Sequence, residues 1–237
     1  MNNYRASFTL ILTAAFITAP LLVRDFSGFS ADQLPIPQVN PPVQPAGYAF
    51  GIWGLIYLWL LVSAIYGLVW RRNDMHWNAV RPSLCLSLAF GVPWLWVAQQ
   101  SALWATVLIL PMTGAAIAAL IRTPDMDAWL LRGPVALYAG WLTAASGVAL
   151  ATIAAGYGIG LGSYGWAFVG IIAALSIAIA VYRARPAPVY LIAIIWALVG
   201  IGVANGFDRF LVTATALGGV AILICVMAIY APPQHRN

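Results

Sequence analysis

The chain has 237 residues, of which 63% are hydrophobic and 7% are charged, and its formal net charge is +5. Water-soluble domains carry about 25% charged residues, so this composition excludes a soluble globular protein and predicts a protein embedded in lipid. The positive charge does not point to nucleic acid, because the arginines stand singly or in pairs between hydrophobic runs and form no basic block.

Eight hydrophobic runs divide the chain, and each is close to the length that a membrane-spanning helix needs, about 17–25 residues. The segments between them contain glycine, proline, asparagine, aspartate or arginine, which are common at helix ends and membrane interfaces. We therefore expect an all-α, polytopic membrane helix bundle. The runs are Ser7–Val23, Gly47–Trp70, Pro82–Gln99, Ala102–Ile121, Pro134–Ala155, Tyr164–Val181, Pro188–Ala204 and Phe210–Tyr230.

The arginines support the number of spans independently. When the connections are assigned alternately to two sides, one side holds Arg5, Arg71, Arg72, Arg81, Arg122, Arg132, Arg183, Arg185 and Arg236. The other side holds only Arg24 and Arg209, each next to an aspartate. Because cytoplasmic loops are enriched in positive residues, we expect a bacterial inner-membrane protein with both termini in the cytoplasm.

The first run could also be a cleaved signal peptide, which would leave seven helices and an external N-terminus. It ends in Pro20, Leu21, Leu22 and Val23 rather than in a small-x-small cleavage site. We therefore expect the first run to be retained as a helix.

The second run begins after three prolines in five residues and continues from Gly47 to Val69 without a charged residue. Gly47, Gly51 and Gly54 lie near one helical edge, where small residues allow a neighbouring helix to come close. Beside them stand four aromatic residues, Tyr48, Phe50, Trp53 and Tyr57. This run is expected to form one wall of whatever site the protein has.

Two connections leave alternatives open. The segment Arg24–Ala46 is long and rich in proline, serine, aspartate and glutamine, and it is either a plain external loop or a lid over a cavity. Asn205, Asp208 and Arg209 form either an external turn, because Gly206 interrupts the run, or a functional polar group within the membrane.

The sequence lacks the residues of common catalytic and metal sites. Its only histidines, His76 and His235, lie in segments expected to be cytoplasmic, and Cys85 and Cys225 lie singly in hydrophobic runs. No spacing suits haem, zinc or a di-metal site, and the near absence of acidic residues from the spans disfavours an ion-coupled pump. Binding must then depend on shape, on stacking and on a few hydroxyls.

Eleven tryptophans are present. Those near the ends of runs suit membrane-interface anchors. Six that lie at or inside the runs either pack between helices or line a ligand site, and these two interpretations are equally open. They are Trp53, Trp94, Trp96, Trp104, Trp141 and Trp196.

Three blocks resemble the tryptophan-rich sensory protein family (TspO/MBR), which is related to the translocator protein or peripheral-type benzodiazepine receptor. Residues 45–57, PAGYAFGIWGLIY, are similar to that family's P-x-x-x-F-x-x-x-W-x-x-L-Y signature. Trp94 and Trp96 are similar to the tryptophan pair of its third helix, and residues 133–145, GPVALYAGWLTAA, to its fifth helix. The resemblance covers about residues 9–155, and the remaining helices look like those of a longer bacterial branch.

The resemblance implies a TspO-like five-helix core in residues 1–155 and three additional transmembrane helices in residues 156–237. It also implies a sensor or binding protein for flat apolar ligands, such as a tetrapyrrole, a sterol or an isoprenoid-like molecule, under a first loop that acts as a lid. The expected partners are the lipid bilayer, this small apolar ligand and a second copy of the chain. No cofactor is expected beyond a bound tetrapyrrole or lipid. The ligand-binding residues expected are Tyr48, Phe50, Trp53, Tyr57, Trp94, Trp96, Tyr138, Trp141 and Asn205.

Other functions remain as alternatives. The chain could be a facilitative small-molecule transporter or a structural subunit of a membrane complex. The single enzymatic alternative is light-dependent porphyrin breakdown with tryptophan as a redox partner, and we expect binding rather than turnover.

Overall fold

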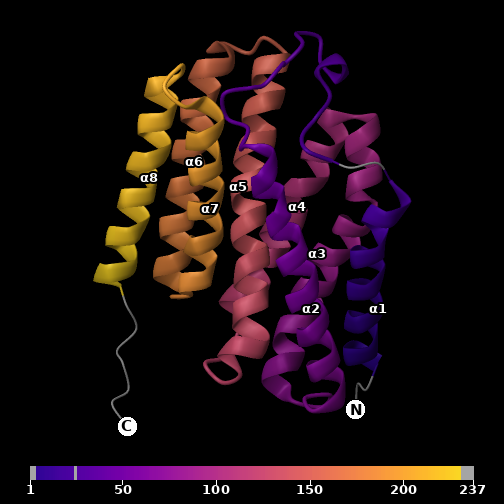
Figure 1. Cartoon of the computed structure of the whole chain (residues 1–237). Helices are drawn as coiled ribbons and strands as arrows, with labels where there is room; N and C mark the ends of the chain where they lie inside the picture. Colours follow the sequence, from indigo (N-terminus) through magenta and orange to yellow (C-terminus); the bar gives the residue numbers. More distant parts are fainter. Residues whose placement is uncertain (1–3, 24–25, 231–237) are drawn as a thin grey trace.

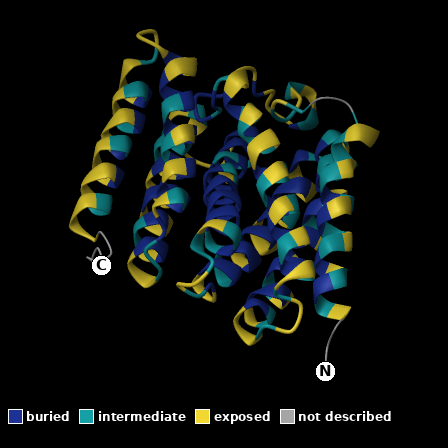
Figure 2. Cartoon of the chain, turned by 60° about the horizontal axis from the view of Figure 1, so that its bottom comes forward, coloured by how far each residue is buried: buried dark blue, intermediate teal, exposed yellow. Residues whose placement is uncertain are grey.

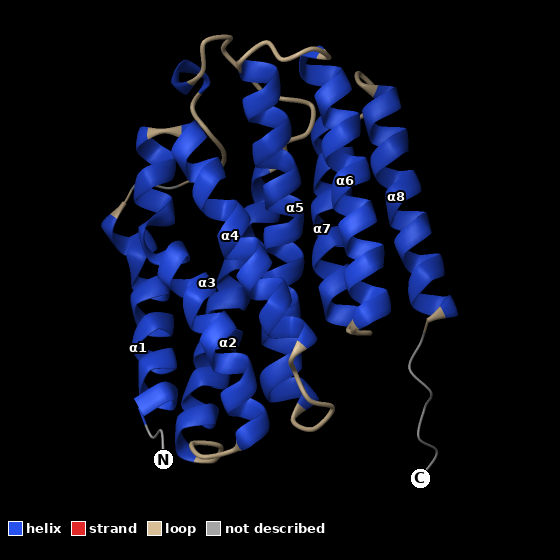
Figure 3. Cartoon of the chain, turned by 180° about the vertical axis from the view of Figure 1, so that it is seen from behind, coloured by secondary structure: helices blue, strands red, loops and turns tan. Residues whose placement is uncertain are grey.

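Eight long helices form the structure, a computed structural model that describes residues 4–23 and 26–230 (Figure 1). Within those residues there is no strand (Figure 3). All eight helices are long and apolar enough to cross a membrane, so the predicted all-α membrane bundle is confirmed. They are α1 (Tyr4–Thr18), α2 (Ile52–Val69), α3 (Met75–Gln100), α4 (Ala102–Ile121), α5 (Gly133–Gly156), α6 (Gly162–Ala184), α7 (Pro188–Asn205) and α8 (Phe210–Ile229).

Short turns extend several of these helices. The 3₁₀ turn η1 (Ala19–Leu22) follows α1, η2 (Ala31–Gln33) lies in the first loop, and η3 (Gly47–Gly51) leads into α2. The π-helical turn η4 (Ala128–Arg132) leads into α5. The second predicted span therefore begins as a 3₁₀ turn and becomes α-helical only at Ile52.

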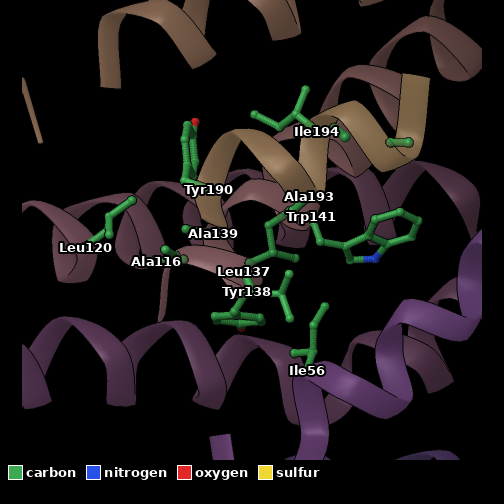
Figure 4. Packing of buried hydrophobic residues seen from close by; sticks show 14 of the residues in the cluster. Ile56, Ala116, Leu120, Leu137, Tyr138, Ala139, Trp141, Tyr190, Ala193 and Ile194 are labelled. Atoms are coloured by element: carbon green, nitrogen blue, oxygen red, sulfur yellow. The ribbon is translucent and has the colours of Figure 1, made fainter. Parts of the chain in front are cut away.

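Helix α5 is the centre of the bundle. It packs against α2 and α4 on one side and against α6 and α7 on the other, and α8 packs outside α6 and α7. Figure 2 shows it as the dark-blue helix surrounded by the others. Close-packed side chains surround it on opposite sides, with Tyr138 and Ile56 on the α2 side and Tyr190 and Ile194 on the α7 side (Figure 4).

Small residues on α5 allow the neighbouring helices to come close. A Cβ atom on Gly140 would collide with the backbone of α7, and Gly147 of α5 faces Gly170 of α6 in the same way. The glycine edge of the second span, for which the sequence predicts a close helix contact, makes no such contact among the described residues. At Gly47, Gly51 and Gly54 an added Cβ atom would meet no atom within 4 Å, so none of the other described helices packs closely against this edge.

Helix α3 begins earlier than the sequence predicts. The hydrophobic run starts at Pro82, which leaves Arg81 in the preceding connection, whereas the helix starts at Met75 and contains Pro82 and Pro93. The Asp74 side chain caps it by accepting hydrogen bonds from the backbone N–H groups of residues 76 and 77. The buried Arg81 donates to the carbonyl oxygens of residues 67, 71 and 72, and so caps the C-terminus of α2.

The first described turn of α1 and the last turn of α8 lie at the same end of the bundle, which we call the terminal face (Figure 1). Three ion pairs join its turns, Arg71 with Asp127 and both Arg132 and Arg185 with Asp125. The opposite end, which carries the first loop, is called the loop face. Arg24 and Arg236, which contributed to the predicted orientation, lie outside the described residues.

Candidate ligand-binding cavity

The start of the second span directs three aromatic side chains into the bundle. Phe50 lies in the turn η3, and Trp53 and Tyr57 follow one and two turns later, which places all three near one face. The rings of Trp53 and Tyr57 are stacked, with centroids 5.3 Å apart and planes 22° apart. This pair forms the α2 wall of the site.

Two further tryptophans come from α3 and α5. The Trp141 ring meets Phe50 and Trp53 edge to face, at centroid distances of 5.9 and 6.2 Å. The buried Trp94 indole donates its N–H to the carbonyl oxygen of Ala105 at 2.9 Å, which fixes the ring while its apolar surface faces the cavity. The polar group of Trp94 is therefore satisfied without a ligand.

Residues of the first loop cover the aromatic rings on the side of the loop face. Phe26 packs edge to face on Trp94, with centroids 5.2 Å apart, and also on Phe29 and Phe50. The Gln44 amide N–H donates to the carbonyl oxygen of Ser27, which ties the end of the loop to its beginning. Loop residues 26–29 and 44–45 thus lie over the aromatic rings.

Two apolar cavities meet at these rings. The first, of about 60 Å³, lies between the loop, α3, α4 and α5, with Thr152 and Gln44 among its few polar lining residues. The second, of about 180 Å³, lies between α1, α2, α3 and α4. Both are lined by Phe26, Phe50, Trp53, Trp94 and Met112.

The loop is held to the bundle by hydrogen bonds to several elements. Gln33 donates to the carbonyl oxygens of residues 98 and 99 at the end of α3. The Ile36 N–H donates to Gly156 of α5, and the Ala46 N–H to Gly200 of α7. The loop therefore runs across the mouth of the bundle at the loop face (Figure 1), as a lid would.

The predicted site residues fall into two groups. Phe50, Trp53, Trp94 and Trp141 line the first cavity, and Phe50, Trp53, Tyr57 and Trp94 line the second. The other four predicted residues, Tyr48, Trp96, Tyr138 and Asn205, line neither cavity.

Tyr48 and Trp96 point away from both cavities. Tyr48 is half exposed and packs edge to face on Trp196 of α7. Trp96 is 62% exposed on α3. Because it is two residues from Trp94, it lies about 200° around the same helix and faces outward.

Tyr138 and Asn205 are buried but are not lining residues of these two cavities. The Tyr138 hydroxyl lies 2.9 Å from that of Ser87, and its ring packs edge to face on Phe16. The Asn205 amide donates to the carbonyl oxygens of Pro42 and Ile201, at the far end of α7. It lines a separate, polar recess.

Several lining residues were not predicted from the sequence. Phe16 of α1 and the loop residues Phe26 and Phe29 complete the aromatic enclosure. The two phenylalanines of the sequence FSGF, residues 26–29, could have indicated that this part of the loop packs on the bundle, since aromatic residues are unusual in an exposed polar loop.

The lining of this enclosure is mainly apolar and aromatic. No carboxylate, arginine or histidine is among the residues that line the two cavities. Within the described part of the chain no cluster of histidine, cysteine or acidic residues could hold a metal ion. The enclosure offers aromatic faces and edges, methionine and a few polar atoms, which suit an apolar ligand.

Comparison with known proteins gives the family. A family model described as TSPO-like protein matches residues 7–229. No curated protein and no solved structure matched the chain in the corresponding searches. The family match runs through all eight helices, including the three beyond residue 155, so the resemblance seen in the aromatic blocks extends over the whole bundle. With its membrane-spanning helices and this match, the chain belongs to the TSPO-like protein family.

Proposed function

We propose that the protein binds a flat apolar ligand, a tetrapyrrole in the first instance, in the aromatic enclosure beneath the first loop. The single observation that carries this proposal is the convergence of Phe50, Trp53, Trp94 and Trp141 from three helical segments on one apolar cavity. Conjugated rings stack on such walls without needing a charged partner. Sterols and isoprenoid-like molecules are the other members of the same ligand class.

The size of the enclosure indicates how such a ligand would enter. The cavities of about 60 and 180 Å³ are each smaller than the roughly 300–1,000 Å³ of typical ligand pockets. They share lining side chains, including Phe26 of the loop and Phe50 of η3. A ligand that displaces Phe26 joins the two cavities, so loop movement is part of the proposed binding step.

The proposed role is that of a sensor or carrier in the membrane. The aromatic residues around the enclosure hold the ligand by stacking. Displacement of the first loop then converts binding of the ligand into a change at the protein surface. We further propose that the terminal face is cytoplasmic, because it carries Arg71, Arg122, Arg132, Arg183 and Arg185. The membrane is proposed to be a bacterial inner membrane.

Titration of the purified protein with protoporphyrin, followed by tryptophan fluorescence, tests the proposal. We expect saturable quenching in the wild type and at least tenfold weaker affinity in Trp53→Leu and Trp141→Leu, because each loses a wall of the enclosure. Trp96→Leu is the matched control, since that indole is exposed on the same helix as Trp94. Equal affinities in all three variants would refute the assignment of the site.

A further inference from the structure

A separate cavity, of about 300 Å³, lies at the loop face between the end of the first loop and the turn from α7 to α8. Its lining differs in character from the aromatic enclosure, since it contains the polar residues Asn40, Gln44, Asn205, Asp208 and Arg209. We call it the polar recess. Gln44 and Pro45 line both the polar recess and the first aromatic cavity, so these two residues form the wall between them.

The hydrogen bonds of the Asn205 amide indicate which kind of ligand group the recess could bind. Its N–H₂ group donates to the carbonyl oxygens of Pro42 and Ile201, each at 2.8 Å. Because both partners are acceptors, the amide nitrogen must face them and the amide oxygen must face the other way. That oxygen is buried and has no partner among the described residues. A buried acceptor without a donor is unfavourable, so the site calls for a donor.

The carboxylate of Asp208 favours a cationic donor. Asp208 also lines the recess, and among residues 4–23 and 26–230 it forms no ion pair. Among the described residues that line the recess the one cation is Arg209, which contacts the first loop and Tyr164 and forms no ion pair with Asp208. It donates to the carbonyl oxygen of Asn40 at 2.7 Å, and its guanidinium lies 6.0 Å from the centre of the Tyr164 ring. The recess is therefore lined by a carboxylate that forms no ion pair with any described residue, and by Asn205, whose buried amide oxygen has no donor among them.

We propose that the polar recess binds a primary ammonium group, which Asp208 attracts and which donates a hydrogen bond to the Asn205 amide oxygen. A quaternary ammonium has the charge but no N–H, and an anion would face the carboxylate and the amide oxygen. This site is independent of the apolar ligand proposed above.

Two sources could supply the ammonium group. One is a small soluble amine, because the recess lies at the end of the bundle rather than at its middle. The other is the ethanolamine headgroup of a phospholipid. The adjacent turn exposes Phe207 and Phe210, and aromatic residues at helix ends are typical of the membrane interface, where such headgroups lie.

The site would also stabilise the closed first loop. Asn205 donates to the carbonyl oxygen of Pro42, and Arg209 donates to that of Asn40. Asn205, which accepts from the ammonium, therefore also holds the last part of the loop. A ligand that fixes Asn205 should therefore fix the wall formed by residues 44 and 45.

The experiment uses the full chain in detergent and compares two pairs of probes. Ethanolamine and choline are titrated by calorimetry, and phosphatidylethanolamine and phosphatidylcholine are compared by native mass spectrometry. Within each pair the quaternary member lacks the N–H donor. Asp208→Asn removes the charge from an exposed residue, so the fold should be retained, and Asp32→Asn is the control because Asp32 is an exposed loop carboxylate outside the recess.

We expect the primary amine of at least one pair to bind at least tenfold more strongly than its quaternary counterpart. Asp208→Asn should lower that binding about tenfold, because the ammonium loses the carboxylate that attracts it, and Asp32→Asn should leave it unchanged. Preference for ethanolamine identifies a soluble amine, and preference only for the phospholipid identifies a headgroup. Equal binding of primary and quaternary probes in both pairs, or an Asp208→Asn variant that binds like the wild type, would overturn the proposal. Protoporphyrin quenching is measured separately, so either proposal can fail alone.

Discussion

Gly140 of α5 packs directly against the backbone of Tyr190 in α7. A Cβ atom at Gly140 would fall inside the contact distance of the Tyr190 carbonyl oxygen and only 2.9 Å from the Cβ of Ala193. The Tyr190 hydroxyl reaches back to that of Thr143 of α5 at 3.0 Å. Close backbone approach and a hydroxyl pair therefore join the central helix to the three-helix part of the bundle.

Replacing Gly140 by alanine should destabilise the protein by about 1–3 kcal/mol, because the clash is with backbone and forces the helices apart. Gly114→Ala is the matched control, since a Cβ atom there meets nothing within 4 Å and alanine favours the helix. Thermal unfolding in detergent, followed by circular dichroism, compares the two. A Gly140→Ala variant as stable as Gly114→Ala would contradict the packing.

The ion pair between Arg71 and Asp127 should make stability depend on pH. The hydrogen bond from Arg71, at 2.6 Å, holds the pKa of Asp127 below its ordinary value, and Trp77 also donates to this carboxylate. A carboxyl with a depressed folded pKa contributes stability above its unfolded pKa of about 3.9, and this contribution is lost as the pH falls through the folded value.

The change that tests this is Asp127→Asn, because asparagine also tolerates the left-handed conformation at this position, φ 52°. The variant should be less stable than the wild type at pH 7 and should lose less stability on acidification below about pH 4. Chemical unfolding in detergent at both pH values measures the difference. Arg71→Gln should reproduce the loss at pH 7, and the double variant should be little worse than either single one. Additive losses would show that the two residues act separately.

Much of the bundle could be predicted from the sequence, because hydrophobic length and arginine placement depend only on local composition. The predicted start of α3 was wrong for a physical reason. The charge of Arg81 suggests a position outside the helix, whereas its guanidinium is buried and satisfied by carbonyl oxygens at the end of α2. The true start of the helix is marked instead by its cap, Asp74, whose carboxylate accepts from the first N–H groups of α3.

The candidate site was predictable only in part. Helical spacing correctly groups Phe50, Trp53 and Tyr57, but the same rule separates Trp94 from Trp96, which the motif alone had paired. The contribution of Phe26 depends on the path of an irregular loop, which no periodicity encodes. Asn205 lies far along α7, so its recess is apparent only once the end of the loop is placed against it.

Tyr138 provides a test of which residues touch the ligand. Its hydroxyl is paired with Ser87 and its ring is covered by Phe16. Tyr138→Phe should therefore leave protoporphyrin affinity within about twofold and lower stability by about 0.6 kcal/mol, the average for a hydrogen bond between membrane helices. Fluorescence titration and thermal unfolding measure the two effects. Weakened binding with unchanged stability would mean that the hydroxyl orients the ligand.

Movement of the first loop can be tested by locking it to α5. Leu34 packs on Gly156, where an added Cβ atom would lie 2.9 Å from the Leu34 Cβ, and the Ile36 N–H donates to the Gly156 carbonyl oxygen at 2.8 Å. Disulfides require a Cβ separation of about 3.5–4.5 Å, so a small shift would allow Leu34→Cys and Gly156→Cys to form one. The exposed Cys225 is first changed to alanine, and the buried Cys85 is retained.

If the ligand enters by displacing the loop, the oxidised double variant should take up protoporphyrin at least tenfold more slowly than the reduced one, because the disulfide holds the loop against α5. Stopped-flow tryptophan quenching measures the rate, and each single cysteine variant controls for the substitutions. Addition of a thiol reductant should restore the rate of the Cys225→Ala parent. Equal rates before and after reduction would mean that the ligand reaches the rings by a route that does not need the loop to move away from α5.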